Sequence, residues 1–167
     1  IKFHNGAAFD ADDVVYTVDY VTKPESKVLS TISAWIDHAE KHAKYKGRIV
    51  TKTVEPAALA YLAASSAVIH PHEYYAKVGP KGMNEKPVGT GPYRVTEHAI
   101  GKFVRLERNP NYFRDSPKTQ PKIGKVEIRF IPDSQTQIAE SVSGGVDLIM
   151  GVARDLLDDA HIRRAYL

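Results

Sequence analysis

The densest run of glycine and proline in the chain occupies residues 79–92, and it limits how much of the sequence can pack as a single unit. Proline lacks a backbone N–H, and glycine loses the most conformational freedom on folding, so both disfavour the interior of helices and strands. We therefore predict that this stretch connects two packed units. It contains Gly79, Pro80, Gly82, Pro87, Gly89, Gly91 and Pro92.

A helix is predicted over residues 11–22, before this connector. Asp10 belongs to a residue type that caps helix N-termini, Asp13 stands at the third helical position, and Pro24 follows the end of the pattern. The apolar positions at helical spacing are Val14, Val18 and Val21.

The next segments give three further predictions. Residues 26–46 show a weaker helical face followed by a stretch rich in His and Lys, and Gly47 ends it. Residues 48–54 are rich in β-branched residues and predict a strand, and Pro56 begins a short buried helix over 56–64. The apolar face of the first segment consists of Ile32, Trp35, Ile36 and Ala39.

Beyond the connector, apolar and polar residues alternate with the period of a strand. Residues 93–97 and 103–108 are predicted to pair across a turn at Gly101, and residues 109–111 (Asn-Pro-Asn) form the next turn.

Residues 125–150 predict a βαβ unit with a parallel strand pair. The first strand ends at Pro132, a capping box of Ser134 and Gln137 opens the helix, and residues 146–150 form the second strand. The glycine pair at 144 and 145 ends the helix, and another helix is predicted over 154–166. The fold class is therefore α/β, a mixed sheet with flanking helices.

Composition and motifs argue against several classes of function. The net charge is only +3 and the basic residues are scattered, so we expect no nucleic-acid partner. There is no cysteine, no Gly-x-Ser-x-Gly nucleophile motif and no phosphate-binding loop. The adjacent carboxylates at 12–13 and 158–159 fit solvated helix positions. We predict no catalytic residues, no enzyme activity and no cofactor.

Seven histidines raise the question of a metal site. His70 and His72 flank a proline, and His38 and His42 would share one face of a helix. Neither pair has an identifiable third ligand, which zinc sites usually need. We interpret these side chains as exposed histidines in polar segments and predict no metal site, with metal transport through His70 and His72 left as an alternative.

Aromatic residues provide the candidate ligand contacts. Trp35 is the only tryptophan, and the chain has nine tyrosines, whose rings combine apolar area with one hydroxyl each. A Tyr-rich surface suits small polar ligands, although such rings also fill cores. We name Trp35 and Tyr16 as candidate contacts, together with Gly89, Thr90 and Gly91.

Three segments in the same order resemble the extracytoplasmic solute-binding proteins of peptide and nickel ABC transporters, known as family 5. The first segment reads FHNG at 3–6 and FDADDVVY at 9–16. The second reads PVGTGPY at 87–93, followed by VRLERNPNYF at 104–113. The third reads IPD at 131–133 and GVDL at 145–148.

The resemblance implies a periplasmic-binding-protein-like fold of class II, with two lobes that close over a small ligand, a peptide first of all. It also implies a periplasmic or extracytoplasmic location and delivery of the ligand to an ABC permease in the membrane. Residues 1–68 would be part of the small lobe and 69–167 part of the main N-terminal lobe, with the distal C-terminal lobe absent from this fragment. A carrier of metal chelates, or a sensor or interaction domain on the same scaffold, are the alternatives.

Overall fold

The computed structural model describes residues 1–23, 33–63, 68–117 and 119–150. By their contacts these residues form two compact units. The first contains Ile1–His98 and Arg105–Val126, and the second contains Ala99–Val104 and the described residues from Glu127 onward. The proposed lobe boundary at residues 68 and 69 stays a prediction, because lobes are defined by a complete binding protein.

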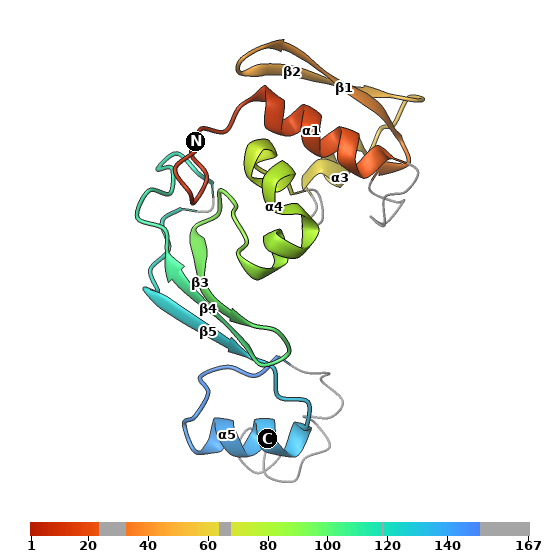
Figure 1. Cartoon of the computed structure of the whole chain (residues 1–167). Helices are drawn as coiled ribbons and strands as arrows, with labels where there is room; N and C mark the ends of the chain where they lie inside the picture. Colours follow the sequence, from red (N-terminus) through yellow and green to blue (C-terminus); the bar gives the residue numbers. More distant parts are fainter. Residues whose placement is uncertain (24–32, 64–67, 118, 151–167) are drawn as a thin grey trace. The chain divides into compact units, whose positions relative to one another are not determined.

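Helix α1 spans Ala11–Thr22, as the sequence predicts (Figure 1). The Asp10 side chain accepts a hydrogen bond from the Asp12 N–H, and the Asp13 side chain accepts one from the Asp10 N–H. This reciprocal capping box satisfies backbone donors that the first helical turn leaves free. The helix buries one face, formed by Ala11, Asp13, Thr17 and Val18.

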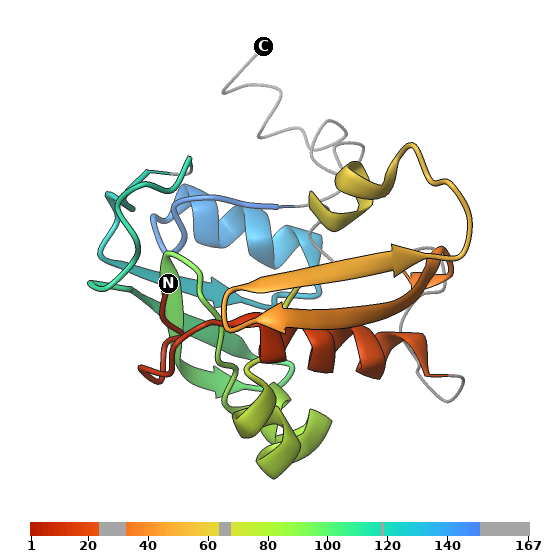
Figure 2. The ribbon, with the colours of Figure 1, turned by 90° about the horizontal axis from the view of Figure 1, so that it is seen from above.

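A two-stranded antiparallel hairpin packs on α1: β1 (Ile36–Ala43) and β2 (Lys46–Thr51) (Figure 2). Trp35 and Ile36 join Val18 of α1 in a buried apolar cluster. The helix predicted over 26–46 is therefore wrong for its described second half. Trp35, Ile36 and Ala39 fit a helical face by spacing, but backbone pairing with residues 46–51 makes this segment a strand.

Two helices follow, and both differ from expectation. Helix α3 (Ala58–Ala63) forms where a short helix is predicted, but it is not buried, since Leu59 is 81% exposed. Helix α4 (His72–Glu85) takes up the first half of the predicted connector. Gly79 has a positive φ of 65° that kinks it, and Pro80 then opens a second helical segment, where its missing N–H costs nothing. The irregular connector begins only at Lys86.

A three-stranded sheet has the order β3-β4-β5, formed by β3 (Tyr93–Ala99), β4 (Phe103–Arg108) and β5 (Lys125–Arg129). The predicted strand pair across Gly101 is confirmed. The Arg108 N–H donates to the Gly124 carbonyl at 2.9 Å, and the Phe130 N–H donates to the Lys102 carbonyl at 2.8 Å. From residue 102 to residue 108, the hydrogen-bonded partner moves from residue 130 back to residue 124, so β4 and β5 are antiparallel.

Helix α5 (Ser134–Val142) follows β5, but its cap lies one residue earlier than predicted. Asp133, not Ser134, is the N-cap, and its carboxylate accepts from the Thr136 N–H. The hydrogen bond from the Thr136 hydroxyl, together with this one from the backbone, lowers the pKa of Asp133.

The second strand of the predicted βαβ unit is absent from the described chain, because residues 146–150 form no strand. The N–H groups of Gly145 and Val146 donate to the Glu140 carbonyl, so the chain turns back on the end of α5. Leu148 and Met150 are 78% and 90% exposed. An apolar run becomes a strand only beside another strand, and no described strand lies along this one.

The α/β class is confirmed, although both described sheets are antiparallel and the expected parallel pair does not form. The helix predicted over 154–166 lies outside the described residues. Within the described ranges, none of the helices has the length and apolar character needed to cross a bilayer.

Gly101 gives a direct test of the β3–β4 turn. Its φ is +72°, a conformation that costs an alanine roughly 1–2 kcal/mol. Gly124 serves as the control because it has no positive φ. At either position an added Cβ would meet no atom within 4 Å. We expect Gly101→Ala to lower the free energy of unfolding by about 1 kcal/mol, since part of the cost is offset by reduced freedom of the unfolded chain. Gly124→Ala carries no such strain, so in urea denaturation it should leave the free energy of unfolding unchanged or raise it by up to about 1 kcal/mol. Equal effects of the two substitutions would contradict the turn geometry.

Candidate functional site

The Gly89–Thr90–Gly91 loop is held from two sides. On one side, the His4 N–H donates to the Gly89 carbonyl at 2.8 Å, and the His4 ring lies between the Gly89 N–H at 3.3 Å and the Gly91 carbonyl at 3.0 Å. A ring that accepts at Nδ1 and donates from Nε2 fits both contacts in its neutral form. On the other side, the Asn109 amide donates to the Gly91 carbonyl at 3.1 Å.

These contacts give the loop a structural role in the first unit. Hydrogen bonds run through Gly89 and Gly91, while the Thr90 side chain takes no part in them. Neither glycine has a positive φ, and an added Cβ would meet atoms no closer than 3.7–3.8 Å. The contacts with His4 and Asn109, and not a turn that requires glycine, therefore fix this loop.

Asp13 joins the start of α1 to the start of α4. Its carboxylate accepts from the Asp10 N–H at 2.9 Å, from the His72 N–H at 2.9 Å and from His72 Nδ1 at 2.8 Å. Its side chain is only 3% exposed. A buried carboxylate needs such partners, and the positive N-terminal ends of two helices favour its negative charge.

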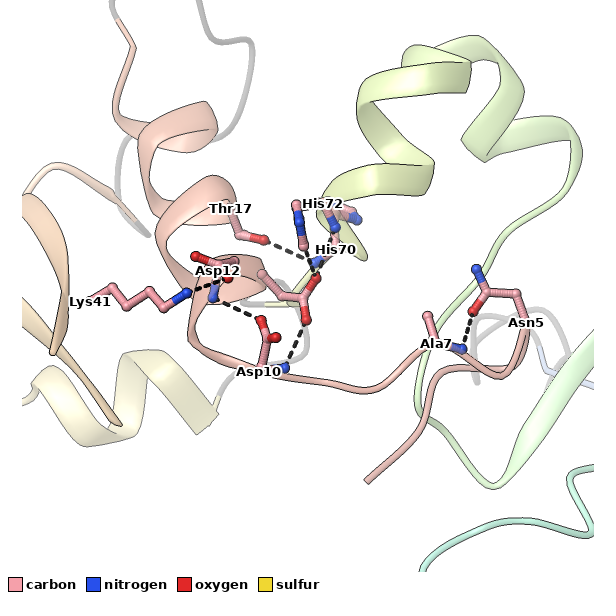
Figure 3. Close-up of polar contacts among 9 residues, drawn as sticks. Asn5, Ala7, Asp10, Asp12, Thr17, Lys41, His70 and His72 are labelled. Atoms are coloured by element: carbon pink, nitrogen blue, oxygen red, sulfur yellow. Dashed lines mark hydrogen bonds and ion pairs between the residues drawn. The ribbon is translucent and has the colours of Figure 1, made fainter. Parts of the chain in front are cut away.

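The neighbouring Asp12 points outward and forms an ion pair with Lys41 of β1, with 2.6 Å between the Lys41 Nζ and the carboxylate oxygen (Figure 3). This hydrogen bond from Lys41 lowers the pKa of Asp12 and raises that of Lys41. The two adjacent aspartates thus have different roles, and neither arrangement resembles a catalytic carboxylate pair.

Three tyrosines and a histidine gather between α1 and α4. The Tyr75 ring is 6% exposed, and its centroid lies 5.1 Å from that of Tyr20, 6.0 Å from Tyr16 and 4.6 Å from His70. Burial, with a hydrogen bond to Tyr20, raises the pKa of the Tyr75 hydroxyl. Tyr16 stands at the edge of this cluster and lines a cavity of about 470 Å³ with Asp19, Tyr20, Thr22 and Lys23.

His70 belongs to the same cluster. Its backbone N–H donates to the Thr17 hydroxyl at 2.9 Å (Figure 3), and burial lowers the pKa of its imidazole from the ordinary value of 6.5. His70 and His72 therefore do not form a pair of ligands, since one packs against Tyr75 and the other binds Asp13.

Trp35 lies in the core, 8% exposed, beside Val18 and Ile36, with its ring 6.1 Å from that of Tyr61. Its indole N–H has no hydrogen-bond partner among the described residues. In this described part, no hydrogen bond or ring contact joins Trp35, Tyr16 and the Gly89–Gly91 loop to one another. Their role as ligand contacts stays a prediction.

A second cavity, of about 490 Å³, lies between the start of α1 and the hairpin, and the sequence analysis missed it. Its volume falls in the range of small-molecule sites. Residues from three separated segments form it, so no local pattern reveals it. The lining consists of Ile1, Phe9, Asp10, Ala11, Val14, Tyr45, Gly47 and Ile49.

The motif segments that hold this unit together also match a known family. A family model described as bacterial extracellular solute-binding proteins, family 5 (middle region), matches residues 1–165. The chain belongs to this family. The family is described as one of extracellular solute-binding proteins, which agrees with the class of function that the motifs imply.

Individual relatives give the extent of the match. The oligopeptide-binding protein AppA of Bacillus subtilis is 26% identical, over 93% of this chain and 29% of the relative. The nickel-binding periplasmic protein of Escherichia coli is 27% identical, over 90% of this chain and 28% of the relative. The structure of the binding protein MoaA of A. tumefaciens R10 in complex with mannopinic acid superposes with a TM-score of 0.82 at 27% identity, over 95% of this chain and 33% of that one. The periplasmic-binding-protein-like fold is confirmed, and the chain spans about a third or less of each relative.

Asp13 is expected to contribute more to stability than its neighbour. Replacement by Ala removes the capping box and takes the acceptor from the half-buried N–H groups of Asp10 and His72, so we expect Asp13→Ala to cost roughly 2–4 kcal/mol of unfolding free energy. Asp12→Ala removes only an exposed ion pair and should cost much less. Denaturant titration of both variants measures the difference, and similar losses would contradict the proposed role of Asp13.

The pKa shift of His70 makes stability depend on pH. The unfolded chain takes up a proton near pH 6.5, whereas the buried imidazole resists protonation until a lower pH. Stability should therefore fall as the pH drops below about 6.5 towards the folded-state pKa. In His70→Gln this part of the loss should disappear, so denaturation at pH 7.5 and pH 5.5 should show a smaller difference than in the parent chain. An unchanged or larger difference would contradict the assignment.

Proposed function

We propose that this chain is part of the substrate-binding component of an ABC-type uptake system, binding a small solute and passing it to a membrane permease. The observation that carries the proposal is the family match over residues 1–165. The structure is compatible with a binding role, because it offers two cavities of about 470 and 490 Å³ in the first unit. The proposal places the protein outside the cytoplasm and assigns it no catalysis.

A peptide is the first ligand to test, since AppA is named for oligopeptides. Peptides carry amides, charges and apolar side chains, and the cavity at Tyr16 combines aromatic rings with a carboxylate and an ammonium group. A nickel chelate is the second candidate, favoured by the similarity to the nickel-binding protein. A sensor or interaction domain on this scaffold would bind without a permease.

Among the proposed contacts, Tyr16 has the strongest support because it is half-buried beside a cavity. Thr90 is the member of its loop whose side chain takes no part in the bonds to His4 and Asn109. Trp35 would have to present to a ligand its small exposed edge, or its indole N–H, which has no partner among the described residues.

Calorimetry with tri- to pentapeptides, glutathione and nickel–histidine tests the proposal. We expect weak or undetectable binding by residues 1–167 alone, since ligand sites usually surround most of the ligand and this chain spans about a third or less of its relatives. A protein of the relatives' length that contains this chain should bind one ligand class at micromolar concentration or better. Micromolar binding by the 167 residues alone would show that they form a complete site, and no binding by the longer protein would overturn the proposal.

In that longer protein, Tyr16→Leu should weaken binding by roughly 2- to 12-fold, because an aromatic contact contributes about that much affinity beyond the contribution of the apolar area that it buries. Tyr74→Leu is the matched control, because Tyr74 on α4 is half-buried like Tyr16 but belongs to the lining of neither described cavity, and its hydroxyl donates to the Lys86 carbonyl. Equal losses in both variants would exclude a specific role for Tyr16 without touching the transport proposal.

A further inference from the structure

Strand β1 presents its side chains on two faces with different chemistry. Ala39 packs against the apolar core, and Lys41 reaches Asp12 of α1, so these alternate residues face the helix (Figure 3). His38, Glu40 and His42 stand at the positions between them. The wrongly predicted helix also placed His38 and His42 on one face, but only a strand adds Glu40 between them.

The Glu40 carboxylate contacts both imidazoles. One of its oxygens lies 3.3 Å from His38 Nε2, and the other lies 3.3 Å from His42 Nε2. Zinc binds imidazole nitrogen and carboxylate oxygen at about 2.0–2.2 Å, which places neighbouring ligand atoms of a tetrahedron roughly 3.4 Å apart. Each nitrogen–oxygen distance by itself equals one edge of a metal tetrahedron, but the two distances end on different oxygens, and the three ligand groups are not yet gathered as closely as those of Asp10, Asp13 and His72.

A second carboxylate orients one of the rings. Asp37 lies 2.7 Å from His38 Nδ1, which leaves His38 Nε2 on the side of Glu40. A carboxylate on the far nitrogen of a ligating histidine is the usual outer partner of a metal-bound imidazole, because it fixes the tautomer and raises the basicity of the ligand nitrogen.

The two imidazoles contact different oxygens of Glu40, so an ion would have to draw the rings together. All three side chains are 40–46% exposed, which leaves them room to turn and gives an ion access. Arg48 is the competing cation, but its guanidinium lies 3.7 Å from Glu40 and is 65% exposed, so this ion pair is weak. An ion that displaces the Arg48 guanidinium from the Glu40 carboxylate would therefore lose little interaction energy.

The cluster of Asp10, Asp13 and His72 is tighter, with ligand atoms within 4.8 Å of one another, but it is a poorer metal site. Its carboxylates already accept the backbone N–H groups that start α1 and α4. An ion there would break the capping box, whereas no described backbone hydrogen bond depends on the side chains of His38, Glu40 or His42.

We propose that β1 carries a surface site for a divalent transition metal, with His38, Glu40 and His42 as ligands and Asp37 as the residue that orients His38. Two imidazoles and one carboxylate favour Zn²⁺, Ni²⁺ or Cu²⁺ over Mg²⁺ and Ca²⁺, which prefer all-oxygen ligands. The remaining coordination positions belong to water. The inference does not rest on the proposed transport function, since it concerns an exposed strand and free metal ions.

Titration of the untagged 167-residue chain with ZnCl₂ or NiSO₄, against a chromophoric chelator, tests the site. We expect one equivalent to bind, and His38→Gln and His42→Gln each to weaken binding tenfold or more. Asp37→Asn should weaken it by roughly 10-fold, in the range seen for outer-shell partners. His98→Gln on β3, a half-buried histidine outside the hairpin, should leave binding unchanged.

A spectroscopic readout tests the same site without any substitution. Substoichiometric Ni²⁺ should broaden the imidazole proton resonances of His38 and His42 first and leave those of His98 and His70 sharp. The proposal is overturned if the double variant His38→Gln/His42→Gln binds like the parent chain, if His72→Gln abolishes binding while the hairpin variants do not, or if no ion binds below millimolar concentration.

Discussion

The buried carboxylate of Asp13 is the interaction on which the first unit depends. A charge that is almost fully removed from water must be compensated, and here three donors from two chain segments surround it. The same carboxylate closes the capping box of α1 and accepts the first N–H of α4, so two helices nearly sixty residues apart begin at one point. The Tyr75 cluster and the hairpin then pack against an α1 whose start is fixed.

A second set of hydrogen bonds explains which residues the family motifs contain. The FHNG and PVGTGPY segments meet through the hydrogen bonds of His4 with Gly89 and Gly91. Asn109 of the VRLERNPNYF segment donates to the Gly91 carbonyl from the other side. These motifs therefore identify the scaffold. The names of the relatives, which bind oligopeptides, nickel and mannopinic acid, agree with a scaffold that carries different ligand sites.

The sequence predicted local structure well where the signal was local. Helix α1 with its cap at Asp10, the β3–β4 pair across Gly101 and the end of α5 at the glycine pair all depend on residues close to one another. Prediction failed where a distant partner decided the outcome, as in β1, whose apolar spacing fits a helix until β2 pairs with it. It failed in the same way at residues 146–150, where the expected partner strand is missing from the described chain. At 79–85 the reason is local, because Gly79 and Pro80 kink a helix instead of ending one.

By itself, the sequence determined the family, the α/β class and the start of α1 at its cap Asp10, because motif order and capping chemistry depend on residues close together in the chain. The tertiary structure alone decided which polar groups meet. It assigned Asp13 to His72, His4 to the glycine loop and Glu40 to two histidines, and it formed the cavity beside Phe9 and Tyr45 from segments far apart in the chain. Contacts between such segments are set by burial and backbone pairing over the whole unit, and no local pattern of residues encodes them.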